Sequence, residues 1–341
     1  MVFVYAITIS LESIIIEYLT TSFAHFSPIM LSAISITFAG LLLLIVAVCV
    51  FKRAKRLLIL FSKSWKKVVL ASLSLSFGIF TWYDSINKIG ASKEVLIAGP
   101  LEIVIIVILA RAFLRERLSR FQFIGIGIAL VGFFMAVVSD TTFTFPNNTQ
   151  TSITVVSSGL GKSWSLSPVI IGFGDVEAIL SAFGFAGGVI FLTKLAIKYS
   201  SIEVAGASMF TSGLILAAFM VVGLMSNGTS HAVFSFKEIH FLRQPLVYSV
   251  VVVILLFSLL PFVGSLSYST GLSRIGATLT SIIGSSSILM TVVLQIILKE
   301  LGISSHLPEN IFLAIVGGIT GFLGIYVIHF PGHSVWISKK E

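Results

Sequence analysis

The fifty residues from Ser85 to Phe134 read SINKIGASKEVLIAGPLEIVIIVILARAFLRERLSRFQFIGIGIALVGFF. A short polar hinge precedes an apolar helix, a compact basic loop and a second apolar helix with spaced glycines. The same order returns near the C-terminus, where Gly271 to Thr278 read GLSRIGAT against SINKIGAS in the first segment. Aligning Lys88 with Arg274 sets the two copies 186 positions apart. The chain therefore repeats once at about half its length.

The composition indicates a protein that is surrounded by lipid. Of 341 residues, 56% are hydrophobic and only 11% are charged, and the mean hydropathy is +1.07. A soluble domain of this size could not cover its surface with so few charges. The single cysteine, Cys49, excludes an internal disulfide and a cysteine-based metal cluster. The N-terminal apolar run carries Glu12 and Glu17 and has no basic leader, so we interpret it as a retained span.

The apolar segments predict an all-α integral membrane protein with ten transmembrane helices, arranged as two inverted five-helix repeats. The expected spans are 3–23, 28–50, 68–87, 92–114, 121–139, 170–194, 202–225, 246–268, 277–298 and 311–330. The first repeat would occupy residues 1–139 and the second 168–341, joined by an extracytoplasmic linker at 140–167. Because each copy has five spans, the second copy is expected to cross the membrane in the opposite sense to the first.

The distribution of basic residues predicts the orientation. With the N-terminus inside, the inner segments hold 16 Lys and Arg residues and the outer segments hold 6. This bias favours a cell-membrane protein with both termini in the cytoplasm. The two N-x-[ST] sequons, at Asn147 and Asn227, fall in the two longest outer loops, which agrees with this orientation. The inner loop from Phe51 to Lys67 is interpreted as a topology determinant, with an amphipathic helix on anionic lipid as the alternative.

These segments resemble the drug/metabolite transporter superfamily, specifically its EamA-type ten-helix members. The two repeated segments carry the resemblance, together with HFSPIMLSAISITFAGLLLL from His25 and GDVEAILSAFGFAGGVIFLTKLAIKYSSIEVAGASMF from Gly174. It covers nearly the whole chain. It implies two inverted five-helix repeats, cytoplasmic termini and transport of small polar or amphipathic metabolites through a central cavity. Glu12, Glu17 and Glu102 depart from the family pattern.

Glu12 and Glu102 are the strongest candidates for a functional site. Each lies near the middle of its span, where an ionised side chain costs at least about 2.5–3.5 kcal/mol. Such a residue either couples transport to protons, contacts a cationic substrate, or joins helices as a protonated or hydrogen-bonded glutamate. Gly99 and Pro100 should break the helix ladder beside Glu102, which favours function there. For Glu12 both interpretations stay open.

The ninth span supplies further candidates. Ser285 and Ser286 overlay Gly99 and Pro100 when the repeats are aligned. Their hydroxyls would line a polar cavity or bond to the backbone and bend the helix. Gln295, further along the span, is a weaker candidate.

Aromatic and acidic residues near the span ends allow two interpretations each. Trp82 and Tyr268 occupy equivalent positions in the two copies and are either cavity walls or interfacial anchors. Asp84 can pair with Lys88 one turn later, with a role in a vestibule as the lesser alternative. Glu17 is expected to extend toward the outer interface.

Other polar and small residues are interpreted as structural. Asp175 and Glu177 open the sixth span and complement its helix dipole. Glycine stripes are expected to let helices approach closely, at Gly184 and Gly188 and at Gly317, Gly321 and Gly324.

Nucleotide and catalytic motifs are missing from the sequence. Gly159 to Ser163 read GLGKS, but Val156 stands where a P-loop needs its leading glycine. Gly125 and Gly127 lack the third glycine of a dinucleotide fingerprint, and there is no HExxH or GxSxG. We therefore expect no enzyme activity, no cofactor, no bound metal and no nucleic-acid partner. Transport would be driven by a gradient or by exchange, or would be simple facilitation.

The sequence thus predicts a secondary transporter that moves a small polar or amphipathic metabolite by alternating access. The acidic candidates favour cationic or zwitterionic, amino-acid-like substrates. Expected partners are the substrate, membrane lipid and protons, while a homodimer, the direction of transport and the coupling ion stay open. The alternative is a non-transporting membrane receptor or scaffold with the same fold. An intramembrane enzyme is the third alternative, which no nucleophile–base pair supports.

Overall fold

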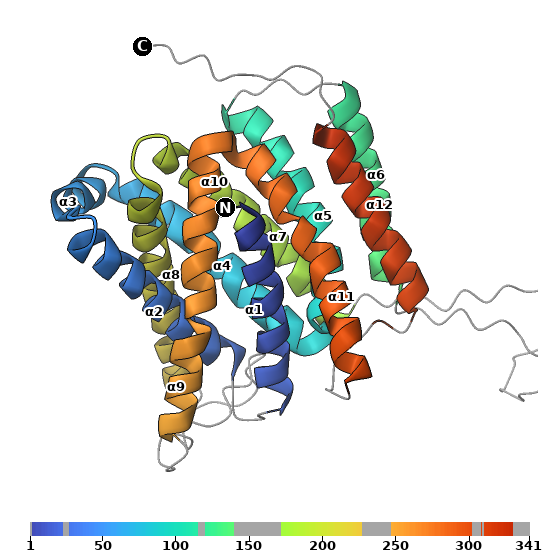
Figure 1. Ribbon diagram of the computed structural model, residues 1–341, viewed down its shortest axis with the longest axis horizontal. Helices are drawn as coiled ribbons and strands as arrows, with labels where there is room; N and C mark the ends of the chain where they lie inside the picture. Colours follow the sequence, from blue (N-terminus) through green and yellow to red (C-terminus); the bar gives the residue numbers. More distant parts are fainter. Residues whose placement is uncertain are drawn as a thin grey trace, which may run out of the picture.

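The computed structural model describes residues 2–22, 27–114, 120–139, 172–226, 247–301, 308 and 310–329. Within these ranges the chain is helical and contains no strand (Figure 1). Its elements are α1 (Val2–Ser22), α2 (Pro28–Cys49), α3 (Ala54–Lys63), α4 (Trp65–Ile89), α5 (Ala91–Leu109), the π-helical turn η1 (Ala110–Leu114), α6 (Arg120–Val138), α7 (Phe173–Ala196), α8 (Ser201–Ser226), α9 (Val247–Phe257), α10 (Leu259–Gly284), α11 (Ser286–Glu300) and α12 (Ile311–His329).

The described residues contain eight segments that are long and apolar enough to cross a membrane. Two shorter apolar segments, Phe123–Val138 in α6 and Ile311–Val327 in α12, correspond to the predicted fifth and tenth spans. The all-helical, multi-span class predicted from the sequence is therefore confirmed. The predicted linker and both sequons lie outside the described residues.

Two elements differ from the prediction. The basic inner loop contains a separate ten-residue helix, α3. The predicted eighth span, 246–268, divides at Ser258 into α9 and α10, because Pro261 has no N–H to donate to the carbonyl of Phe257. Helix α10 then continues past the predicted end, and polar side chains there bond to its own backbone, as Thr270 does to the Leu266 carbonyl at 2.7 Å.

The sequence repeat extends to the backbone conformation. Gly90 ends α4 with φ 81° and ψ 159°, and Gly276 interrupts α10 with φ 81° and ψ 176°. They are the two glycines with positive φ among the described residues, and they lie 186 positions apart, like Lys88 and Arg274. Only glycine adopts this conformation readily, so both copies of the motif make the same break between helices.

The helices of the two halves interleave. The principal partners are α1 with α10, α2 with α8, α4 and α5 with α7, and α6 with α12. Figure 1 shows α6 and α12 side by side at one edge of the bundle, and α1 between α10 and α11. Most of the packing therefore joins residues far apart in the sequence.

Glycines allow the closest approaches between halves. A Cβ on Gly184 of α7 would lie 2.5 Å from the Cα of Gly78 in α4, and one on Gly324 of α12 would lie 2.3 Å from the backbone of Ala129 in α6. Such distances are shorter than any van der Waals contact, so the backbones touch directly. The predicted packing role of these glycine stripes is confirmed.

We expect Gly184→Ala to destabilise the protein, because the added methyl group forces α4 and α7 apart. Overpacking of this kind costs about 1–3 kcal/mol and should lower the midpoint of thermal unfolding in detergent. Gly127→Ala is the matched control, since it gains the same helix propensity and its Cβ would meet nothing within 4 Å. Equal midpoints for the two variants would contradict the close packing.

Candidate functional site

Two adjoining cavities lie between helices of the two halves, with about 650 and about 710 Å³ of space between atoms, part of it open to the outside. Six residues line both: Tyr5, Ile9, Trp82, Glu102, Phe185 and Tyr268. The first cavity extends to Glu94 and to the break between α10 and α11, and the second extends to Glu12 and Ser208. The two cavities therefore meet around Glu102 and the aromatic side chains.

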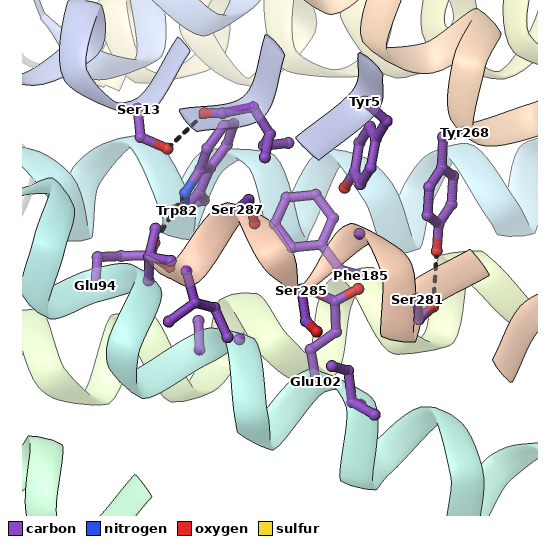
Figure 2. Close-up of a pocket in the computed structure, with 17 residues that line it drawn as sticks. Tyr5, Ser13, Trp82, Glu94, Glu102, Phe185, Tyr268, Ser281, Ser285 and Ser287 are labelled. Atoms are coloured by element: carbon purple, nitrogen blue, oxygen red, sulfur yellow. Dashed lines mark hydrogen bonds between the residues drawn. The ribbon is translucent and has the colours of Figure 1, made fainter. Parts of the chain in front are cut away.

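Glu102 projects from α5 two residues after Pro100. Figure 2 shows its side chain pointing into the space bordered by Tyr5, Phe185 and Ser285. Within the part of the chain that the structure describes, no group donates a hydrogen bond to this half-buried carboxyl group. A carboxylate held away from bulk water without a donor is costly. Glu102 is therefore available to a proton or to a cationic ligand.

The other two acidic residues of the cavities already have donors. Glu94 is buried on α5, where it accepts hydrogen bonds from Trp82 Nε1 at 3.0 Å and from Ser181 Oγ at 3.3 Å. Glu12 is buried on α1 and accepts one from the Tyr83 hydroxyl at 2.9 Å. These bonds offset the cost of burying polar groups. Glu102 thus differs from Glu12 and Glu94 in having no fixed partner among the described residues.

Four aromatic side chains form the walls of the shared space. The rings of Tyr5 and Tyr268 have centroids 4.6 Å apart, and those of Trp82 and Phe185 lie 5.9 Å apart in an edge-to-face arrangement. The Tyr268 hydroxyl lies 3.1 Å from Ser281 Oγ, and the bond to Glu94 fixes the Trp82 indole (Figure 2). Aromatic faces beside a carboxylate suit an ammonium or guanidinium group.

Of the candidates predicted from the sequence, the structure places five on the cavities. These are Glu102, Glu12, Trp82, Tyr268 and Ser285.

Four other candidates do not line either cavity. Pro100 faces α12, where a Cβ on Gly321 would lie 3.0 Å from its ring. Ser286 turns away and donates to the Ile283 carbonyl at 2.8 Å, so its neighbour Ser287 lines the cavity in its place. Asp84 forms an ion pair with Lys88, and Gln295 is buried among polar groups of α1 and α5.

The expectation that Glu17 extends toward the interface is wrong. Its carboxylate is buried and accepts a hydrogen bond from the Ala91 N–H at 2.8 Å, while Gln295 Nε2 also donates to it. Gln295 Oε1 in turn accepts a hydrogen bond from the Ser92 N–H at 2.8 Å. The break at Gly90 leaves the first N–H groups of α5 without helical partners, and within a membrane they need internal acceptors. Glu17 and Gln295 supply them.

A cluster of charges joins α4, α5 and α7 near the Gly90 break. Lys88 Nζ lies 2.8 Å from Asp84 Oδ2 and 2.5 Å from Glu177 Oε1. Lys93 Nζ lies 2.8 Å from Asp175 Oδ1, a close ion contact that lacks hydrogen-bond geometry. The predicted helix-terminal role of Asp175 is confirmed, because its Oδ2 accepts the Gly172 N–H at 2.9 Å. Glu177 instead serves mainly as a partner of Lys88.

Sequence reasoning missed Tyr5, Glu94, Phe185 and Ser281, which all line the first cavity. The sequence could have indicated Glu94, because Glu94, Ala98 and Glu102 follow at four-residue spacing and so share one face of a helix. No sequence pattern distinguishes the aromatic residues, since rings are common throughout apolar spans.

The comparisons with known proteins agree with this architecture. The model of the EamA-like transporter family matches residues 1–138 and 172–330, on either side of the predicted linker. A search of curated proteins finds no match. Twenty solved chains match in structure. One of them, described as "Crystal structure of protein", superposes with a TM-score of 0.56 at 16% sequence identity, and the match covers 94% of this chain and 95% of the solved chain. At that identity the likeness shows the fold alone. The family match spans nearly the whole described chain, and the chain therefore belongs to the EamA-like transporter family.

Proposed function

We propose that this protein is a secondary transporter whose substrate binds in the paired cavities around Glu102. The observation that carries the proposal is the position of that side chain. It borders both cavities, it lies two residues after the proline of α5, and no described group donates to it. Membership of a transporter family makes transport the function that such a site supports best.

The lining favours a small cationic or zwitterionic substrate with an apolar part, such as an amino acid or an amine. Glu102 supplies a negative charge, and four aromatic rings supply π faces within the same space. An ammonium group gains from both, more so when it is removed from water. The Ser281 and Ser285 hydroxyls offer donors and acceptors for a polar group at the other end of the substrate.

We further propose alternating access between two inverted five-helix repeats, at residues 1–139 and 168–341, joined by the linker at 140–167. Three observations support the repeats: the family match in two parts, the paired breaks at Gly90 and Gly276, and the pairing of each first-half span with a second-half helix. The proposed location is the cell membrane, with both termini in the cytoplasm because of the excess of inner basic residues. Protons, membrane lipid and a second copy of the chain are proposed partners.

A thermal-shift screen of purified protein against a panel of metabolites tests the binding site. A ligand present at 100 times its dissociation constant stabilises the folded state by about 2.7 kcal/mol. We expect amines or amino acids to raise the unfolding midpoint of the wild type. The same compounds should leave the unfolding midpoint of Glu102→Gln unchanged. Glu300→Gln is the matched control, because that exposed carboxylate lies at the end of α11, away from the cavities, and the variant should keep the full shift.

A panel that shifts the wild type and Glu102→Gln equally would contradict a site built on Glu102. Binding without uptake into proteoliposomes would favour a membrane receptor or scaffold in place of a transporter.

A further inference from the structure

Helix α3 and its flanks form a basic surface that carries no acidic residue of its own. No Asp or Glu occurs between Glu17 and Asp84. Within the described residues, six exposed basic side chains of this segment take part in no ion pair: Lys52, Lys55, Arg56, Lys63, Lys66 and Lys67. Their like charges repel one another, so the surface favours an anionic partner.

The same segment exposes apolar side chains beside the charges. Leu58 is 70% exposed and Trp65 is 52% exposed, whereas Leu57 and Leu60 are buried against the bundle. Figure 1 shows α3 at the outer edge of the bundle, where it packs against α8 and the start of α4. A short amphipathic helix at that edge has apolar side chains for the acyl region and basic ones for the headgroups of a bilayer.

Polar contacts hold α3 at both ends. Arg53, at its N-terminal end, lies with Nη1 3.3 Å from Oε1 of the fully buried Glu203. Ser64, at its C-terminal end, lies with Oγ 2.9 Å from the Tyr199 hydroxyl. Glu203 also accepts the Ser200 N–H at 3.1 Å. The basic surface is therefore fixed to the start of α8, which makes it a preformed surface.

We propose that α3 and its flanks bind anionic lipid headgroups of the leaflet that they adjoin. The ammonium and guanidinium groups on this anchored helix match phosphate oxygens in charge and in hydrogen-bonding capacity, and the neighbouring apolar side chains match the acyl chains. The proposal does not depend on the transport function. A purely topological role for the basic residues would need no preference among lipids.

Quenching of Trp65 fluorescence by brominated lipids tests the proposal directly. The reporter is a full-length variant that keeps Trp65 as its single tryptophan, reconstituted with brominated phosphatidylglycerol or with brominated phosphatidylcholine. We expect the anionic lipid to quench at a lower mole fraction. The preference is the ratio of the mole fractions at which the two lipids quench equally. In the double variant Lys55→Gln/Arg56→Gln this ratio should fall at least about fivefold. High salt should weaken the preference too, because the charges are exposed.

The matched control is Lys339→Gln/Lys340→Gln, which removes the same net charge from the C-terminal segment, outside the described residues, and should keep the preference. Equal quenching by the two lipids in the wild-type background would overturn the proposal. So would an equal loss of preference in the two double variants, since this would reflect net charge and not a surface at α3.

Discussion

Replacing Glu102 by glutamine should remove most of the substrate uptake and all of its dependence on a pH gradient. The amide has nearly the same shape as the carboxyl group but carries neither the charge nor the exchangeable proton. An interaction with a charged group contributes about 1.5–3 kcal/mol, which corresponds to a loss of roughly ten- to a hundredfold in binding. Initial rates of uptake into proteoliposomes, with and without an imposed pH gradient, measure both effects.

Glu300→Gln again serves as the control, because it makes the same chemical change on an exposed part of α11. Its uptake should equal that of the wild type. Wild-type, pH-driven uptake by Glu102→Gln would reject the coupling role of this residue. Uptake that persists at full rate but has lost its response to pH would restrict Glu102 to proton coupling and leave substrate recognition to other groups.

Lys93→Met should cause the largest loss of stability among single substitutions in the charged cluster. Lys93 and Asp175 are both buried, and removing the lysine leaves a buried carboxylate without its counter-ion. Breaking a buried ion pair from one side costs about 3–5 kcal/mol. The midpoint of thermal unfolding in detergent should fall accordingly.

The double variant Lys93→Met/Asp175→Asn should recover most of that loss. Asparagine removes the charge but keeps an oxygen that can accept the Gly172 N–H at the start of α7, so the cap is preserved. If the double variant is as unstable as Lys93→Met alone, the ion pair between α5 and α7 is not what stabilises this end of the bundle.

The sequence allowed the membrane class and the repeat to be predicted because both depend on local patterns. Long apolar runs indicate spans whatever their neighbours are. The IGAS and IGAT motifs identify Gly90 and Gly276 as equivalent, and the structure gives them the same unusual backbone conformation. The rarity of acidic residues in apolar spans was enough to single out Glu12 and Glu102.

The remaining features of the site depend on which helices meet, and the sequence does not encode this in any local pattern. Nearly every face of these helices is apolar, so periodicity does not indicate which face lines a cavity. Glu17 was therefore assigned to the interface, although it accepts the N–H of Ala91 from another helix. Gln295 was a weaker candidate for the cavity, although it bonds to the backbone of Ser92. Both errors come from contacts between distant segments.

Thiol labelling at Ser285 shows whether water and substrate reach a cavity between the two halves. In a Cys49→Ser background, Ser285→Cys places a single thiol on the wall of the first cavity. A membrane-impermeant reagent should label it from one side of the membrane, and substrate should slow the reaction. Ala39→Cys, at a fully buried packing position on α2, should stay unlabelled. A folded Ser285→Cys protein that reacts from neither side, with or without substrate, would contradict the access of water and substrate to this cavity.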